Sequence, residues 1–179
     1  LDDLKLIKQQ ISLCSDTLRH LRHTADMDSP SVHADITTFC LKIIERFQLL
    51  RPHTHITHSI TSNASRYPFE FPRTIEQAIT NLLNNAADAS PERIDIDITW
   101  DADYMIWIIK DFGDGIDPLL LRHVGKRAYS TKHDGMGIGL LLSHASIDKL
   151  GGEIVYIIPP SKAYNITKIV LPIPRGHSI

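Results

Sequence analysis

Apolar residues recur along this chain with two different spacings. Spacings of three and four residues, typical of one face of a helix, occur at 4–25, 36–50, 74–90 and 135–150. Strict alternation or short apolar runs, typical of strands, occur at 53–60, 93–100, 104–110, 153–158 and 164–171. The pattern predicts helices separated by strands, with the last four strands paired as two hairpins.

The first helical stretch has the 3.5-residue period of a coiled-coil seam. Its apolar positions are Leu4, Ile7, Ile11, Cys14, Leu18, Leu21 and Ala25. We interpret it as one helix of an antiparallel hairpin or bundle that also dimerises; the alternative is a helix packed on its own domain. Residues 26–31 are expected to form a turn or linker, so the predicted division of the chain is 1–28 and 32–179.

Two further helices are predicted from their apolar faces. Residues 36–50 should bury Phe39, Ile43, Ile44, Phe47 and Leu50. Arg51-Pro52 should end that helix, because the residue before proline disfavours helical conformation. The last helix should bury Ile138, Leu141, Leu142, Ala145 and Leu150. Gly151-Gly152 is expected to close it.

Residues 74–90 combine an apolar face with an unusual polar one. The apolar positions are Ile75, Ile79, Leu82, Leu83 and Ala86. At roughly 100° per residue, Asn81, Asn85 and Asp88 fall together on the other side. Because Asn is a poor helix former, this stripe indicates a function for the amides; the alternative is a solvated face that happens to be rich in Asn. A capping box, Thr74-x-x-Gln77, preceded by Pro72, is expected to start the helix.

The order of elements is helix, strand, helix, hairpin, loop, helix, hairpin. Strands paired in hairpins and covered on one face by helices describe an α/β fold. The predicted architecture is a two-layer α/β sandwich with a mixed, mostly antiparallel sheet, preceded by the helix at 4–25.

Composition and charge narrow the function classes. The chain of 179 residues is 42% apolar and 22% charged, which is ordinary for a globular protein, and its net charge of -2 disfavours nucleic-acid binding. Cys14 and Cys40 form no CxxC motif and no disulfide framework, as expected in a reducing cytosol. No signal peptide or spanning apolar run is visible. A start at Leu1 without Met is expected for a piece of a longer protein.

Several familiar motifs are excluded by their context. DFG at 111–113 lacks the other protein-kinase motifs, and GMGIG at 135–139 lacks the third glycine of the dinucleotide fingerprint. No P-loop or HExxH motif is present. His53 and His55 could share one face of a strand and bind a metal, but no third ligand is evident, so a His-rich strand is the preferred interpretation.

Four remaining stretches follow one another in an informative order: NLLNNA from Asn81, DFGDG from Asp111, STK at 130–132, and GMGIGL from Gly135. Together they resemble the N box, the G1 box, the element before G2, and the G2 box of the GHKL superfamily (gyrase, Hsp90, histidine kinase, MutL). The resemblance covers about residues 35–172 and implies the Bergerat type of α/β sandwich, which binds ATP with Mg²⁺.

The resemblance implies a role for each motif. Asn85 should hold Mg²⁺ with help from Asn81, since amide oxygens suit this hard cation. Asp111 should accept the adenine amino N–H, and Gly113 and Gly115 should allow a tight turn beside the base. The helix start at Gly137–Leu140 should meet the phosphates. The implied ligand-binding set is Asn81, Asn85, Asp88, Asp111, Gly113, Gly115, Ile116, Arg127, Ser130, Thr131, Lys132, Gly135, Met136, Gly137, Ile138, Gly139 and Leu140.

Two positions are informative within that superfamily. ATP-hydrolysing members carry a Glu base where this chain has Asn81, so slow hydrolysis and phosphoryl transfer to another acceptor are expected. Many histidine kinases carry Lys or Arg where this chain has Asp88, so the cationic contact is expected from the lid, through Arg127 and Lys132. The alternative for Lys132 is a solvated loop lysine.

The chain is therefore expected to be the catalytic domain of a sensor histidine kinase, resembling the RegB/PrrB type. Such a kinase transfers the γ-phosphoryl of ATP to a His and then to an Asp of a response regulator. No His-Glu-x-x-x-Pro acceptor is present, so this chain alone should not phosphorylate itself. A homodimer through helix 4–25, no nucleic-acid partner, and a cytoplasmic domain anchored in the inner membrane by other segments are expected. The alternatives are a degenerate nucleotide-sensing module and a serine kinase of the anti-sigma type.

Overall fold

The computed structural model describes residues 30–33, 35–62, 69–115, 138–160 and 163–173. The predicted helix at 4–25, most of the linker and the loop that joins the two glycine motifs lie outside the described residues.

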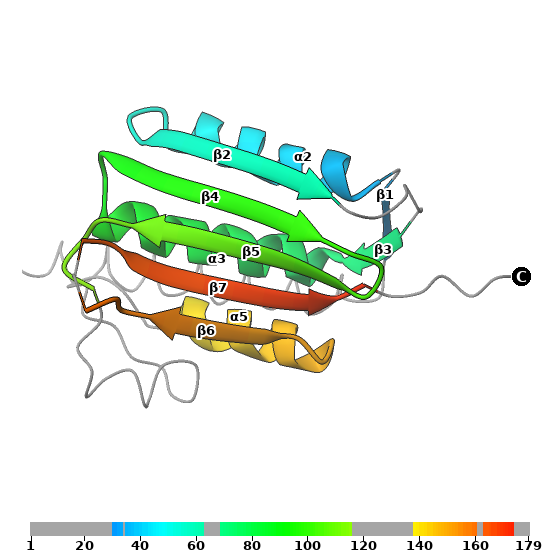
Figure 1. Cartoon of the computed structure of the whole chain (residues 1–179). Helices are drawn as coiled ribbons and strands as arrows, with labels where there is room; N and C mark the ends of the chain where they lie inside the picture. The colour runs from blue at the N-terminus through cyan, green and yellow to red at the C-terminus, as the bar shows by residue number, and fades with distance from the viewer. Residues whose placement is uncertain (1–29, 34, 63–68, 116–137, 161–162, 174–179) are drawn as a thin grey trace, which may run out of the picture.

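A five-stranded sheet forms one layer, in the order β2-β4-β5-β7-β6 (Figure 1). Its strands are β2 (His55–Ser62), β4 (Arg93–Trp100), β5 (Tyr104–Asp111), β6 (Glu153–Ile157) and β7 (Asn165–Pro172). β2 runs parallel to β4, and every other pairing is antiparallel. The predicted mixed, mostly antiparallel sheet and both hairpins are confirmed.

Three helices cover one face of this sheet (Figure 1): α2 (Ile36–Leu50), α3 (Arg73–Ala89) and α5 (Ile138–Lys149). The core between the layers is aliphatic and aromatic, and Trp107, Phe39 and Phe47 are among its largest side chains. Alternate residues of β4 and β5 point into it, as the period-two pattern predicted. The two-layer α/β sandwich is therefore confirmed.

A second, two-stranded sheet lies beside the start of α2. β1 (Pro30–His33) pairs antiparallel with β3 (Phe69–Pro72). The sequence had predicted turn or linker through residue 31, and this was wrong for Pro30 and Ser31. Two short strands with prolines at their paired ends carry little local signal, so only the pairing with β3 makes them visible.

α3 has the predicted apolar face, with Ile75, Ile79, Leu82, Leu83 and Ala86 all buried. Its predicted capping box is wrong. The helix begins one residue earlier, at Arg73, after Pro72 as N-cap, and no side chain caps it. Pro72 ends β3 and enters the helix directly, so Thr74 lies inside the first turn and Gln77 turns toward Asn81 instead.

The other two helices depart from the predicted faces at their ends. α2 ends before Arg51, as expected, but Leu50 is 62% exposed rather than buried. In α5, Ala145 is exposed and Leu141 and Leu142 are half-buried, whereas Ser143 and Ile147 are buried. α5 has apolar residues around much of its surface, so packing against α3 selects the inward face and the sequence pattern does not.

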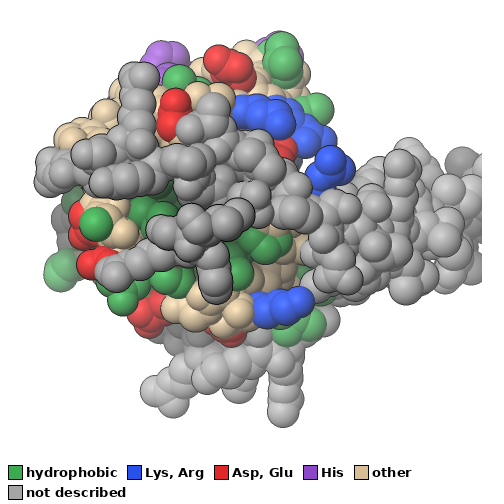
Figure 2. Space-filling model, turned by 90° about the vertical axis from the view of Figure 1, so that its right-hand side faces the viewer, with side chains coloured by type: hydrophobic (Ala, Val, Ile, Leu, Met, Phe, Trp, Pro, Cys, Tyr) green, Lys and Arg blue, Asp and Glu red, His purple; other side chains and the backbone are tan. Residues whose placement is uncertain are grey.

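Figure 2 shows the end of the molecule at which β1 and β3 lie, where a group of Lys and Arg side chains gathers beside hydrophobic ones.

Within the part of the chain that the structure describes, no helix is both long and apolar enough to cross a membrane.

The difference between a buried leucine of α3 and an exposed leucine of α2 gives a prediction about stability. Leu82 is 2% exposed and Leu49 is 82% exposed. Leu82→Ala should lower the free energy of unfolding by about 2–5 kcal/mol, because it removes apolar contacts and leaves a cavity. The matched change Leu49→Ala should stay within about 0.5 kcal/mol. Urea denaturation of both variants measures the difference; equal effects would contradict this placement of α3.

Candidate functional site

The predicted site residues that the structure describes gather at one end of the helical layer. β5 ends at Asp111, the second half of α3 passes beside it, and the first turn of α5 approaches α3 (Figure 1). A methyl group on Gly139 would lie 3.9 Å from the Asn81 Nδ2 atom. The fold therefore brings together three motifs that are far apart in the sequence.

Asp111 is 8% exposed and organises the turn after β5. Its Oδ1 atom accepts from the Gly113 backbone N–H at 3.1 Å and from Asn165 Nδ2 at 2.8 Å. Asn165 stands opposite Asp111 in the register of β5 and β7. Its Nδ2 also donates to the Gly113 carbonyl at 2.9 Å. One amide therefore holds both the carboxylate and the turn.

The two glycines of this turn are required for different reasons. A methyl group on Gly113 would lie 2.3 Å from the Ala89 carbonyl oxygen, so the turn packs directly on the end of α3. Gly115 has φ +79°, a conformation that favours glycine, and its added methyl would lie 2.6 Å from Asn165 Oδ1. The close packing makes the position of the turn depend on α3 and β7.

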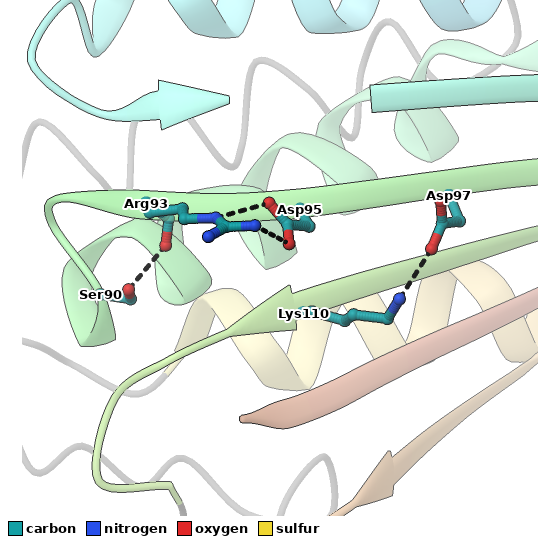
Figure 3. Close-up of polar contacts among 5 residues, drawn as sticks. All are labelled: Ser90, Arg93, Asp95, Asp97 and Lys110. Carbon is teal, nitrogen blue, oxygen red and sulfur yellow. Dashed lines mark hydrogen bonds and ion pairs between the residues drawn. The ribbon is translucent and has the colours of Figure 1, made fainter. Parts of the chain in front are cut away.

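Side chains on the open face of the sheet form two ion pairs near the same turn, Arg93 with Asp95 and Lys110 with Asp97 (Figure 3). The Arg93 guanidinium lies 4.9 Å from the ring centroid of Phe112, a cation–π contact. Arg93 is held in turn by two hydrogen bonds to Asp95, at 2.9 and 2.8 Å. Beside them Lys110 pairs with Asp97 at 2.9 Å, which lowers the pKa of Asp97. Phe112 is therefore part of a surface contact.

The polar face of α3 carries the predicted asparagines. Asn81 Oδ1 accepts from Gln77 Nε2 at 3.0 Å, one turn earlier on the same helix. Asn85 lies one turn later and is half-buried. The buried Ser143 hydroxyl donates mainly to the Gly139 carbonyl at 2.8 Å and shares this hydrogen with the Ala78 carbonyl of α3 at 3.3 Å, so α5 packs closely on α3 here. The amide pair therefore lies on a well-packed helix, next to the first turn of α5.

Asp88 has a partner that the sequence did not reveal. Its Oδ1 atom pairs with Arg51 NH2 at 2.8 Å. Arg51 also donates from Nε to Asn84 Oδ1 at 3.1 Å. Arg51 follows α2, so this contact crosses from α2 to α3 beside the proposed metal ligands.

The remaining predicted residues are only partly covered. The structure describes the backbone of Ile138 and places Gly139 and Leu140 in the first turn of α5. Those outside the described residues are Ile116, Arg127, Ser130, Thr131, Lys132, Gly135, Met136 and Gly137. Their predicted roles remain predictions.

Away from these motifs, the described residues form a further cavity but no cluster of metal ligands. A cavity of about 450 Å³ at the connection of α2 and β2 is lined by Arg51, His53 and His55 among others, but by no residue of α3. No group of three or more His, Cys, Asp or Glu able to hold a metal occurs in the described ranges. His53 precedes β2, so it and His55 do not alternate along one strand.

Residues 70–176 match the family described as histidine kinase-, DNA gyrase B- and HSP90-like ATPase. This match covers more than half of the chain. The chain belongs to this family. Sporulation kinase E of Bacillus subtilis is 31% identical over 105 residues, which are 57% of this chain and 14% of that protein. The sensor histidine kinase RegB of Cereibacter sphaeroides is 23% identical over 177 residues, or 87% of this chain and 36% of that protein.

Solved structures agree with this assignment. The mycobacterial sensor histidine kinase MprB has a TM-score of 0.64 and 25% identity, covering 81% of this chain and 98% of that structure. The catalytic domain of histidine kinase ThkA, at 20% identity, shows the same fold with a TM-score of 0.64 over 80% of this chain and 95% of that structure. The chain is thus an ATP-binding domain of the sensor histidine kinase type. It spans well under half the length of the two curated relatives above.

Sequence reasoning missed two polar residues. Asn165 begins β7, and its register opposite Asp111 joins strands that are not consecutive in the chain, so no local pattern could indicate it. Arg51 was assigned only as the end of a helix. Its contact with Asp88 depends on how α2 packs across α3. A long side chain can reach many positions, so no spacing in the sequence predicts this partner.

Gly113→Ala tests the close packing of the turn on α3. The added methyl would meet the Ala89 carbonyl oxygen at 2.3 Å, so the variant should lose about 1–3 kcal/mol of unfolding free energy and bind ATP more weakly. Gly139→Ala is the matched control for stability, because its nearest neighbour lies at 3.9 Å and alanine favours the helix. Thermal denaturation compares them, and an undisturbed Gly113→Ala protein would contradict the packing.

Asn165→Ala tests the amide that holds Asp111. We expect ATP binding about tenfold weaker, equivalent to about 1.4 kcal/mol, and a smaller preference for ATP over GTP. The control is Thr167→Ala, on the same strand and face but opposite Ile109, where a change within about twofold is expected. Calorimetric titration with each nucleotide measures both, and equal losses in the two variants would contradict the assigned role.

Proposed function

We propose that this chain binds Mg²⁺·ATP and delivers the γ-phosphoryl group to a histidine of a sensor kinase, from which it passes to an Asp of a response regulator. The observation that carries this proposal is the identity of the residue one turn before Asn85. That residue is Asn81, whose amide is hydrogen-bonded to Gln77. A neutral amide cannot take a proton from water, so the bound ATP is kept from hydrolysis and remains available to another acceptor.

The adenine end of the site is supported by the Asp111 network. Because Oδ1 accepts from Gly113 and Asn165, we infer that Oδ2 accepts the adenine amino N–H. Burial of Asp111 removes competing water from that contact. The turn at Gly113 and Gly115 would let the flat base approach the backbone. The first turn of α5, reaching Gly139 and Leu140, would offer backbone N–H groups to the phosphates.

The metal end is supported by the chemistry of α3. Amide oxygens are neutral, hard ligands suited to Mg²⁺ that keeps water and phosphate oxygens as its other ligands. We assign Asn85 as the principal protein ligand. Asn81 assists from the preceding turn, and its oxygen shares its lone pairs with the hydrogen bond from Gln77. When bound, Mg²⁺ would neutralise charge on the transferring phosphoryl group.

The rest of the proposal concerns the whole protein. The acceptor histidine lies on a dimerisation hairpin to which residues 1–28 contribute one helix, and residues 32–179 form the catalytic domain. Arg127 and Lys132 close over the phosphates, and Asp88 lies at the rim. The intact kinase is a homodimer held at the inner membrane by segments other than these. The relatives named as sensor and sporulation kinases support the kinase part of this proposal.

A variant that restores a base tests the proposal. With γ-labelled ATP and Mg²⁺, the full-length protein should acquire an acid-labile, alkali-stable label on histidine. Asn81→Glu should raise ATP hydrolysis about tenfold or more and lower the label, because a carboxylate there can activate water. Gln77→Glu, which adds the same charge one turn away, is the control and should not raise hydrolysis. Bound ATP without any histidine label would refute the transfer and favour a nucleotide-sensing module.

A further inference from the structure

The charge of α3 does not match a polyphosphate ligand. The only Lys or Arg in the sequence of the helix is Arg73, at its first residue, whereas Asp88 lies near the other end, three residues after Asn85. A carboxylate beside bound phosphates repels them, and this repulsion is strong in a partly desolvated site. A cation from another element is therefore needed on this side of the site.

Arg51 is the residue that follows α2, and both its backbone and its side chain are held by hydrogen bonds. Its backbone N–H caps α2 by donating to the Phe47 carbonyl at 3.0 Å. Its guanidinium reaches across to α3, with Nε on Asn84 Oδ1 at 3.1 Å and NH2 on Asp88 Oδ1 at 2.8 Å. Asn84 is itself fixed, because its Nδ2 donates to the Thr80 carbonyl at 3.0 Å.

The geometry of α3 puts this guanidinium at one edge of the polar stripe, where Asp88 lies. At about 100° per residue, Asp88 lies roughly 60° from Asn85 and roughly 40° from Asn84 around the helix axis. Asp88 therefore stands between the residue that anchors Arg51 and the proposed metal ligand. The side chains of Arg51 and Asp88 are 36% and 29% exposed, so the pair lies at the rim and is accessible to a ligand.

We propose that Arg51 is a phosphate-binding residue of this domain, and that its contacts with Asp88 and Asn84 hold its guanidinium near the nucleotide phosphates. This inference rests on the proposed function and adds a cation on the α3 side of the site. The two contacts engage two of the five N–H donors of the guanidinium, whose planar fork can also meet phosphate oxygens. The same pairing neutralises Asp88. Arg51 therefore removes the repulsion between Asp88 and the phosphates, and its own charge attracts them.

A second ion pair provides a matched control. Arg46, which lies on α2 itself, pairs with Glu76 of α3 at 3.0 Å, and Glu76 lies near the start of that helix, away from Asn85. Arg46→Gln and Arg51→Gln each remove one α2–α3 ion pair and one positive charge. They differ in distance from the proposed phosphate position and in the hydrogen bond to Asn84, which only Arg51 makes.

The experiment is calorimetric titration of both variants and the unchanged chain with Mg²⁺·ATP and with adenosine, which has no phosphates. Arg51→Gln should weaken Mg²⁺·ATP binding about tenfold or more and change adenosine binding by less than about twofold. Arg46→Gln should leave both within about twofold. The Arg51→Gln variant should also show a flatter dependence of ATP affinity on salt, because one charge contact is gone.

Three results would overturn the inference. They are unchanged Mg²⁺·ATP affinity in Arg51→Gln, an equal loss for adenosine and ATP, and an equal ATP loss in Arg46→Gln. The second would indicate that Arg51 acts only on the packing of α2 and α3. Binding of Mg²⁺·ATP by the unchanged chain tests the proposed function separately, so a failure there is distinguishable from a failure of this inference.

Discussion

Burial of one side of α3 is the constraint on which the rest of the structure depends. Its apolar residues, including Ile79, Leu82 and Leu83, are sealed against the sheet. A helix is rigid, so fixing that side also fixes the opposite stripe of Asn81 and Asn85 relative to the strand ends. Hydrophobic burial on one side of α3 thereby positions polar chemistry on the other side.

The turn after β5 converts this placement into a site. Gly113 lies against the Ala89 carbonyl, so the end of α3 and the turn occupy positions that depend on each other. Asn165 then ties the turn to β7 through Asp111 and the Gly113 carbonyl. A helix, a central strand and a neighbouring strand meet at one carboxylate. The buried Ser143 fastens α5 to α3, which brings the last of the described motifs to the same end of the molecule.

Charges at this end are paired both across elements and within one strand. Asp88 on α3 is paired by Arg51 after α2, and Arg93 on β4 contacts Phe112 while holding Asp95. Exposed ion pairs contribute little to stability. Here the Arg51–Asp88 pair matters for where it places charge. It neutralises Asp88, and the guanidinium of Arg51 can itself bind phosphate.

The sequence by itself determined the secondary elements with strong periodicity, the two hairpins and the family, and it predicts the motif residues Asn85, Asp111 and Gly113. Those depend on local spacing, which a single chain displays. It did not determine the start of α3, the strand at Pro30–His33 or the inward face of α5, where local signals were weak or ambiguous. Only the tertiary structure decided that Asn165 holds Asp111 and that Arg51 meets Asp88. Such contacts arise from strand register and helix crossing, and these are set by burial across the whole core, which no local pattern encodes.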